Sequence, residues 1–330
     1  MQYSTMGRTG MLVSKICVGT WNFGTYTDEG EAFRIMDMAL DAGINFIDTA
    51  NAYPAVGHRG KSEEIIGRWF AQGNGRREKT VLATKVFSFT EDANDGPNEG
   101  HGLSTYKIRR HIEASLRRLN TEHVELYQMH HVWREATWDE LWDAFENLFR
   151  QGKIDYVGAC NFAGLHLMQA QQAAKERHFL GLVSEQDQYN LLCRLPELEV
   201  IPAAQYLGIG FLPYSPLSGG KLAGPSMMSA DGRSRRADMK GTPEQLEKFR
   251  KQMEKYSALC TDIGENEAHV ALAWLLSNPA VTSLITGPRT AQQLEDMLEA
   301  VEMELDGAVL SRLDEIFPGP GGPAPEAYAW

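Results

Sequence analysis

The chain has 330 residues, of which 43% are hydrophobic and 23% are charged, and its formal net charge is −12. These proportions are ordinary for a globular protein with a sizeable core. The negative charge argues against a nucleic-acid or anionic-membrane partner, because both require a basic face, and no apolar run approaches membrane-spanning length.

The cysteines and histidines show no metal-binding pattern. Four cysteines lie far apart, with no CxxC pair and no zinc spacing, which favours reduced thiols and a cytoplasmic location. They are Cys17, Cys160, Cys193 and Cys260. The histidines form no ligand spacing either, so we predict no metal site. The first residues lack an apolar core, and no signal peptide is predicted.

Strand and helix patterns alternate along the chain. A hairpin outside the main fold is predicted for residues 2–14, around Gly7-Arg8-Thr9-Gly10. Buried strands are predicted at residues 15–20, 46–49, 81–86, 124–130, 156–161, 182–186, 210–215 and 281–287. Helices are predicted at residues 29–40, from 62 onward with Ser62 as N-cap, and at 105–119, 138–151, 165–176, 196–207, 243–263, 267–276 and 290–301.

Eight strand–helix units predict an α/β protein with a (β/α)8 TIM barrel, an N-terminal β-hairpin and an extended C-terminal tail. We expect one domain over residues 1–330, and a doubly wound parallel sheet is the structural alternative. The tail from Pro318 is rich in proline and glycine, so it cannot form a helix or a central strand. Its apolar ending, Tyr328-Ala329-Trp330, predicts that it packs back on the surface.

Four polar side chains follow neighbouring strands of this barrel. Asp48 ends the second strand and Tyr53 lies in the loop after it, while Lys85 and His130 end the third and fourth strands. Barrel active sites lie at the carboxyl ends of the strands. We therefore expect these four side chains to converge.

The four residues suggest carbonyl chemistry. A buried Asp48 needs a cationic partner, which Lys85 provides. The ammonium should lower the pKa of the Tyr53 phenol and make it a general acid, while His130 orients the carbonyl oxygen. Such a site supplies no electrons, so it requires a hydride donor such as a nicotinamide. Considered alone, Asp48 and Lys85 favour a structural ion pair, and only together with Tyr53 and His130 at neighbouring strand ends do they favour a catalytic site.

Several stretches together resemble the aldo-keto reductase superfamily. They are residues 19–21, 45–53, 82–85, 126–130, 157–162, 214–217 and 286–290. The resemblance implies an NADPH-dependent oxidoreductase whose catalytic tetrad is Asp48, Tyr53, Lys85 and His130. No GxGxxG follows the first strand, which fits this family and argues against a Rossmann domain.

The resemblance also implies a cofactor site. Asn161 and Gln186 match residues that bind the nicotinamide carboxamide, and Tyr214 matches the aromatic residue that stacks on the ring. Arg289 and Gln293 match the adenosine end, where a bidentate cation suits the 2′-phosphate of NADPH rather than NADH. The other implied cofactor positions are Gly19, Thr20, Trp21, Asp48, Cys160, Ser215, Pro216, Leu217, Gly219, Lys221 and Gly287. Cys160 and Met297 depart from the serine and asparagine common in the family, which predicts weaker cofactor contacts there.

A narrower resemblance concerns the substrate, which is expected to be a small-molecule carbonyl. His131, residues 68–73 and residues 325–330 resemble an actinobacterial branch that includes nucleotide-diphosphate keto-deoxysugar reductases. By position, the predicted pocket walls are Trp21, Phe23, His131 and Trp133, and such aromatic walls suit a sugar or a ring ketone. Taken alone, His131 favours a packed or solvated histidine over a residue that contacts the substrate.

A second reading of the same resemblance is a binding protein rather than an enzyme. It would be an NADP(H)-binding regulatory subunit with little turnover, like the potassium-channel beta subunits that share this fold. The oligomeric state is left open between a monomer and a weak homo-oligomer. The direction of the reaction in the cell is open as well.

Overall fold

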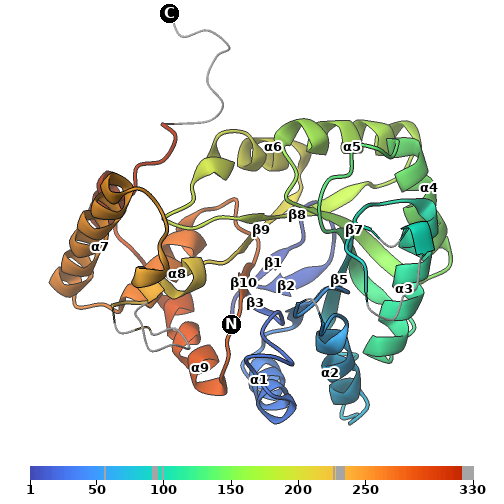
Figure 1. The fold of residues 1–330 in the computed structure, drawn as a ribbon, viewed down its shortest axis with the longest axis horizontal. Helices are drawn as coiled ribbons and strands as arrows, with labels where there is room; N and C mark the ends of the chain where they lie inside the picture. The colour runs from blue at the N-terminus through green and yellow to red at the C-terminus, as the bar shows by residue number, and fades with distance from the viewer. Residues whose placement is uncertain (56, 91–95, 99, 226, 228–234, 322–330) are drawn as a thin grey trace, which may run out of the picture.

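The computed structural model describes residues 1–55, 57–90, 96–98, 100–225, 227 and 235–321. Eight parallel strands form a closed barrel in the order β10-β3-β4-β5-β6-β7-β8-β9, with helices around the outside (Figure 1). The predicted (β/α)8 barrel is confirmed. A doubly wound sheet is excluded because β3 pairs with β4 on one side and with β10 on the other.

The barrel strands follow the predicted order. They are β3 (Ile16–Gly19), β4 (Phe46–Asp48), β5 (Val81–Val86), β6 (Val124–Met129), β7 (Ile154–Cys160), β8 (Leu182–Gln188), β9 (Gly210–Tyr214) and β10 (Leu284–Thr286). The last strand is shorter than predicted. Val281 makes only an isolated bridge to Phe211 instead of joining it.

The helices that cover the barrel also follow the predicted order, with one addition. They are α1 (Glu29–Asp41), α2 (Lys61–Phe70), α3 (Thr105–Leu119), α4 (Trp138–Arg150), α5 (Gly164–Glu176), α6 (Val200–Leu207), α7 (Pro243–Ile263), α8 (Glu267–Ser277), α9 (Ala291–Glu299) and α10 (Gly307–Ile316). Short 3-10 turns are η1 (Gly96–Asn98), η2 (Leu195–Glu197), η3 (Ser218–Gly220), η4 (Arg235–Asp238) and η5 (Ala300–Glu302). The helix α10 was not predicted.

The N-terminal hairpin is a separate two-stranded sheet, β1 (Tyr3–Thr5) with β2 (Leu12–Ser14). It nevertheless packs tightly on the barrel, because its Met6 and Val13 are fully buried among side chains from the barrel interior. At the turn, Gly7 has φ +54°, and a Cβ there would lie 2.6 Å from the backbone oxygen of Gly208, which follows α6. The hairpin therefore closes the amino end of the barrel.

The predicted N-cap of α2 is wrong. The helix begins at Lys61 with Gly60 in the cap position, and no side chain caps it. Ser62 is fully buried instead, and its Oγ lies 2.7 Å from Thr20 Oγ1. The hydroxyl joins a polar network beneath β3, so it is not available to the first turn of the helix.

Three sequence expectations concern the chain as a whole. Among the residues that the structure describes, no helix is long and apolar enough to cross a membrane. Residues 322–330 lie outside the described residues, and with them the predicted packing of Tyr328-Ala329-Trp330. The expectation of one domain over residues 1–330 stays a prediction.

Candidate active site

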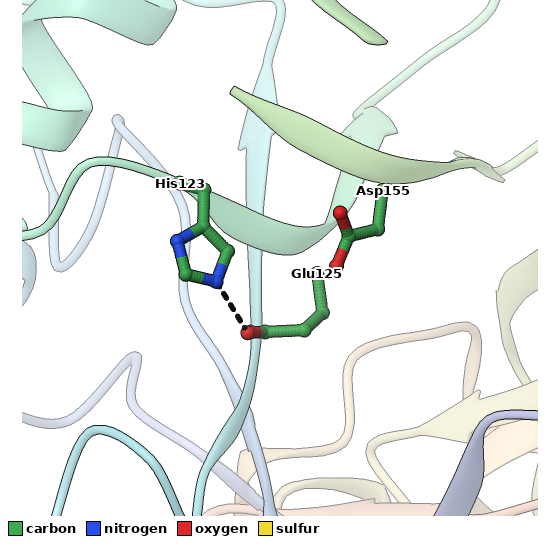
Figure 2. A group of neighbouring side chains, drawn as sticks. All are labelled: His123, Glu125 and Asp155. Carbon is green, nitrogen blue, oxygen red and sulfur yellow. Dashed lines mark ion pairs between the residues drawn. The ribbon is translucent and has the colours of Figure 1, made fainter. Parts of the chain in front are cut away.

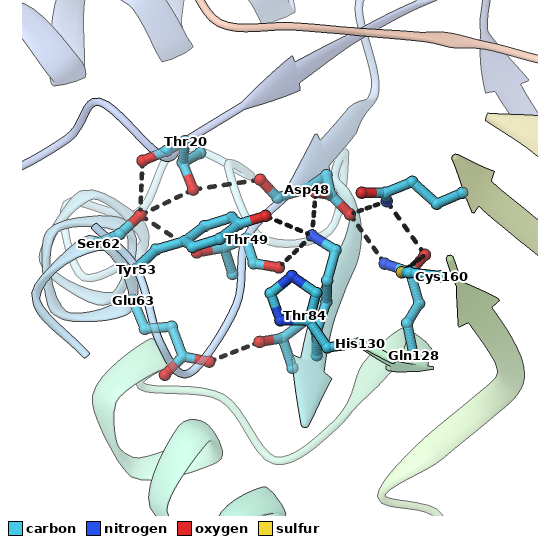
Figure 3. Close-up of polar contacts among 12 residues, drawn as sticks. Thr20, Asp48, Thr49, Tyr53, Ser62, Glu63, Thr84, Gln128, His130 and Cys160 are labelled. Carbon is cyan, nitrogen blue, oxygen red and sulfur yellow. Dashed lines mark hydrogen bonds and ion pairs between the residues drawn. The ribbon is translucent and has the colours of Figure 1, made fainter. Parts of the chain in front are cut away.

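The four predicted catalytic residues meet where β4, β5 and β6 end. Figure 3 shows Asp48, Tyr53 and His130 around this point. Asp48 and Lys85 are 1% and 0% exposed, and Asp48 Oδ1 pairs with Lys85 Nζ. The same Nζ donates to the Thr49 carbonyl at 2.9 Å and lies 3.3 Å from Tyr53 Oη. The His130 and Tyr53 rings meet edge to face, with centroids 5.7 Å apart.

The strand pattern explains why these side chains point inward. Phe46 on β4 and Ala83 on β5 belong to the cluster that fills the barrel interior. Residues two apart on a strand share a face, so Asp48 and Lys85 point into the same interior. Asp48 pairs in register with Ala83, which leaves Lys85 one step nearer the opening.

The pKa shifts in the site correct one expectation. Burial disfavours the charged form of Lys85, but Asp48 and Tyr53 outweigh it and the pKa of Lys85 is raised. For Tyr53, burial raises the phenol pKa more than Lys85 lowers it, and Asp48 raises it further. The predicted lowering of the Tyr53 pKa is therefore wrong, because burial desolvates the phenolate more than Lys85 stabilises it, and Asp48 offsets part of the lysine's effect.

The same shifts define the state of His130. Burial, followed by the charge of Lys85 and the neighbouring His131, holds the pKa of His130 well below its usual range. Its ring is therefore neutral at physiological pH. Its Nδ1 is buried and has no hydrogen-bond partner among the described residues. A neutral imidazole can donate one hydrogen bond from a ring nitrogen to a carbonyl oxygen.

Two glutamine amides hold the second oxygen of Asp48. Its Oδ2 accepts from Gln128 Nε2 at 2.8 Å and from Gln186 Nε2 at 3.0 Å. Gln128 Oε1 lies 3.2 Å from Gln186 Nε2 and 3.7 Å from Cys160 Sγ. Sequence reasoning missed Gln128. Its position two residues before His130 on the same strand was the available signal.

Asn161 and Tyr214, both predicted to contact the nicotinamide, are linked to each other. The Tyr214 hydroxyl donates to Asn161 Oδ1 at 2.9 Å, and Asn161 Nδ2 donates to the His130 carbonyl at 3.0 Å. These bonds join the ends of β6, β7 and β9 into one rim. Gln186, by contrast, directs its amide to Asp48 rather than to the opening.

The predicted phosphate and adenosine contacts lie on the loops after β9 and β10. Ser215 and Gly219 have φ values of +53° and +65°, and a Cβ at Gly219 would meet open space. The Arg289 guanidinium lies 4.9 Å from the Tyr26 ring centroid, and the Arg289 amide donates to Gln293 Oε1 at 2.9 Å.

The remaining predicted cofactor positions differ in exposure. Gly19 and Thr20 are buried, and Thr20 Oγ1 lies 3.1 Å from the Asp48 carbonyl oxygen. Gly19 allows β10 to pack closely, since a Cβ there would lie 2.7 Å from Ile285 Cγ2, and the Thr20 side chain belongs to the internal polar network. Trp21 and Gly287 are exposed, Lys221 and Leu217 are partly buried, and Pro216 is buried.

Aromatic rings gather near His130. His131 stacks on His130 with centroids 5.3 Å apart, and Phe87 lies 5.1 Å from His131 and 5.9 Å from Trp133. Trp21 is 47% exposed. Phe87 was not predicted as a wall residue, because nothing in its sequence position separated it from the other residues of a long loop.

Phe23 does not fit its predicted place in the pocket wall. Its side chain is 0% exposed and belongs to the main hydrophobic core. Its backbone bridges to Thr27 in a tight loop after β3. An apolar residue after a strand can face either the core or an opening, and here packing directs it to the core.

A second polar cluster lies at the amino ends of β6 and β7. Ligand atoms of His123, Glu125 and Asp155 lie within 4.8 Å of one another (Figure 2). Glu125 already accepts from Arg77 at 2.9 Å and from the Leu82 amide at 2.7 Å. With the Arg77 cation already bound to Glu125, the contacts are those of a structural ion-pair network.

The family follows from comparison of the whole chain with known proteins. Residues 15–317 match the model of the aldo/keto reductase family. This chain belongs to the aldo/keto reductase family. It is 57% identical over 332 residues to the Uncharacterized oxidoreductase YrpG of Bacillus subtilis (strain 168), covering 100% of both chains.

More distant aldo/keto reductase relatives are also full-length matches. Protein tas of Escherichia coli (strain K12) is 30% identical, covering 98% of this chain and 100% of its own. A probable voltage-gated potassium channel subunit beta of Arabidopsis thaliana is 29% identical, covering 96% of each chain. Family membership supports an oxidoreductase that reduces carbonyl groups with a nicotinamide cofactor.

Proposed function

We propose that this protein reduces the carbonyl group of a small molecule to an alcohol, with NADPH as hydride donor and Tyr53 as general acid. The observation that carries the proposal is the 3.3 Å separation between Tyr53 Oη and Lys85 Nζ, beside the buried ion pair with Asp48. A bound NADPH supplies the hydride. Tyr53 gives its proton to the carbonyl oxygen, and the phenolate left behind is stabilised by the adjacent ammonium.

His130 has a separate role in this proposal. Because its ring is neutral, it acts as a hydrogen-bond donor that orients the carbonyl oxygen rather than as a second acid. The edge-to-face contact with Tyr53 places both groups on one side of the site. The substrate oxygen would therefore lie between the phenol and the imidazole.

The carboxyl end of the barrel suits a dinucleotide phosphate. Lys221 and Arg289 are cations on the loops after the neighbouring strands β9 and β10, in a chain of net charge −12. Arg289 offers a planar guanidinium suited to a 2′-phosphate. Asn161 and Tyr214 would hold the nicotinamide end, and Gly219 allows close approach of the backbone to phosphate.

For the substrate we propose a nucleotide-diphosphate 4-keto-6-deoxyhexose of a natural-product pathway. The rings of Phe87, His131 and Trp133 near His130, with the exposed Trp21 after β3, suit the apolar face of a sugar ring. The resemblance of His131 and its neighbours to the deoxysugar-reductase branch supports the same substrate. We also propose a cytoplasmic location, and a monomer or weak homo-oligomer as the working form.

The test is a titration of the purified protein with NADPH and with NADH, followed by tryptophan fluorescence. Tight and selective NADPH binding is expected, and Arg289→Met should weaken NADPH more than NADH. Tyr53→Phe should abolish carbonyl reduction while NADPH still binds. Absence of binding by both cofactors, or near-normal turnover by Tyr53→Phe, would overturn the proposal.

The similarity to potassium-channel beta subunits supports a second candidate function. In it, the protein binds NADP(H) tightly as a regulatory subunit and turns over little substrate. Measuring turnover alongside NADPH binding distinguishes the two functions. Tight NADPH binding with negligible turnover on aldehydes, ketones and keto-sugars would favour the regulatory subunit.

A further inference from the structure

Gln128 holds the Asp48 carboxylate at the base of the site (Figure 3). We propose that Gln128 is a positioning residue, whose side-chain amide fixes Asp48 in the orientation that keeps Lys85 beneath Tyr53. The kinetic consequence of this inference rests on the proposed carbonyl reduction. The geometric consequence does not.

The contacts determine which way the Gln128 amide faces. Its Oε1 lies 3.2 Å from the Gln186 Nε2 donor and 3.7 Å from Cys160 Sγ. Its Nε2 lies 2.8 Å from Asp48 Oδ2. In the flipped orientation, an amide oxygen would face a carboxylate oxygen and an amide nitrogen would face another amide nitrogen. Only the observed orientation satisfies all three contacts.

Each oxygen of Asp48 thus has its own partner. Oδ1 pairs with Lys85, and Oδ2 accepts from Gln128 and Gln186. A carboxylate bound at both oxygens cannot rotate without breaking a charge-assisted hydrogen bond. Since Lys85 is held through Oδ1, the orientation of Asp48 determines where Nζ lies relative to the Tyr53 hydroxyl.

The two glutamines are not equivalent. Gln186 is also predicted to bind the nicotinamide carboxamide. Its Nε2 already lies 3.0 Å from Asp48 Oδ2 and 3.2 Å from Gln128 Oε1, so donating to the carboxamide would draw Nε2 away from Asp48. Gln128 has no such second assignment, and it is 0% exposed. It is therefore the donor that keeps Asp48 in place while Gln186 contacts a bound cofactor.

The surroundings of Gln128 and Asp48 matter for a pH-dependent test. Titratable groups face this pair from each neighbouring element of the site. They are Cys17 on β3, Tyr53 after β4, Lys85 on β5, His130 after β6, Cys160 on β7, and Glu185 and Asp187 on β8. Burial raises the pKa of both thiols, and the pKa of His130 lies well below its usual range. Burial raises the pKa of Asp187 to about 6 and that of Glu185 well above its usual range. Both carboxyls are present in every variant, so a titration that appears only in Gln128→Glu belongs to the new carboxyl.

Three variants test the inference. Gln128→Leu removes the donor at similar size, and Gln128→Glu replaces the amide by a carboxyl that donates only when protonated. Ser184→Ala is the matched control, because Ser184 Oγ is buried in the same interior and has no hydrogen-bond partner among the described residues. Should Gln128→Leu not fold, Gln128→Met takes its place.

The expected result is a split between kcat and KM. A hydrogen bond to a charged group is worth enough to change a rate by about 10- to 100-fold. Gln128→Leu should lower kcat by that factor, with KM for the carbonyl and Kd for NADPH within about twofold of wild type. Gln128→Glu should regain kcat as the pH falls from 9 to 6, whereas wild type, Gln128→Leu and Ser184→Ala should not.

Two kinetic outcomes would overturn the inference. One is wild-type kcat in Gln128→Leu, and the other is a loss in Gln128→Glu that does not depend on pH. If wild type itself shows no turnover, the proposed function fails, and crystal structures then decide the inference alone. Gln128→Leu should show a rotated Asp48 carboxylate and an Nζ–Oη separation longer than 3.3 Å, and an unchanged carboxylate would overturn it.

Discussion

Lys85 Nζ lies 3.3 Å from the Tyr53 hydroxyl while its charge is paired with Asp48. The lysine is therefore close enough to bind the phenol, but its field is largely compensated. The phenol pKa is raised by burial despite the nearby ammonium. In this site Lys85 positions the phenol and stabilises the phenolate that forms on proton transfer, which by itself lowers the pKa of Tyr53, but burial of the hydroxyl outweighs that lowering.

The first prediction concerns the pH dependence of reduction. The reaction requires the protonated phenol, and its pKa is raised above the ordinary value of about 10. The kcat/KM for carbonyl reduction should therefore stay flat from about pH 6 to 9 and fall only above about pH 10. Steady-state rates in constant-ionic-strength buffers measure this. A fall centred near pH 7 would contradict the raised pKa.

The second prediction concerns the stability of the ion pair. Asp48→Asn or Lys85→Met leaves one buried charge without a partner, which should cost about 3–5 kcal/mol in the free energy of unfolding. The free energy of unfolding of the double variant should fall by less than the sum of the losses in the two single variants. Since the pKa of Lys85 is raised in the folded state, its contribution is present below about pH 10.4 and is lost as the pH rises further. Urea denaturation of the three variants measures the coupling, and strictly additive losses would contradict it.

The third prediction concerns acid stability. Burial lowers the pKa of His130 well below the ordinary value of about 6.5, so below that pH the unfolded chain binds a proton that the folded chain does not. This residue should cost up to about 1.4 kcal/mol of stability for each pH unit below 6.5. His130→Gln should lose less stability than wild type between pH 7 and 5, and His58→Gln at an exposed position is the control. Parallel losses in all three proteins would contradict the shift.

The fourth prediction concerns the packing of α2 on α3. A Cβ at Gly67 would lie 2.1 Å from the Arg118 carbonyl oxygen, whereas a Cβ at Gly307 in α10 would meet nothing within 4 Å. Gly67→Ala should destabilise the protein by about 1–3 kcal/mol or more despite the better helix propensity of alanine. Gly307→Ala should be neutral or slightly stabilising. Thermal unfolding of both measures the contrast, and equal melting temperatures would show that α3 shifts freely.

Patterns with a strong local cause could be predicted from the sequence. The period of the strands and the parallel geometry of a barrel were sufficient to place Asp48, Lys85 and His130 at one opening. The predictions that failed concerned residues whose positions depend on packing between distant segments. Serine is a common N-cap residue, but the hydroxyl of the buried Ser62 bonds to Thr20 instead of to the helix. Phe23 follows a strand end, as a residue of a pocket wall would, but its side chain packs in the core.

The predicted pKa shift of Tyr53 was wrong, and the role of Gln128 was missed, for a related reason. Each depends on the sum of several neighbours within a few ångströms, from four different strands or loops. A sequence shows the cation but not how much of its charge Asp48 compensates. It shows a glutamine in a strand but not that its amide bonds with Asp48 and Gln186.

The pairing of β3 with β10 has a consequence for synthesis of the chain. Ile16 pairs with Leu284, and Arg8 donates to the carbonyl oxygens of Leu180 and Leu207. The first barrel strand to leave the ribosome, β3, therefore has no partner on one edge until the last barrel strand, β10, has been synthesised. During that interval both edges of the growing sheet present unpaired backbone groups. A nascent chain that stalls before residue 284 keeps an open edge, which makes it a natural client for chaperones.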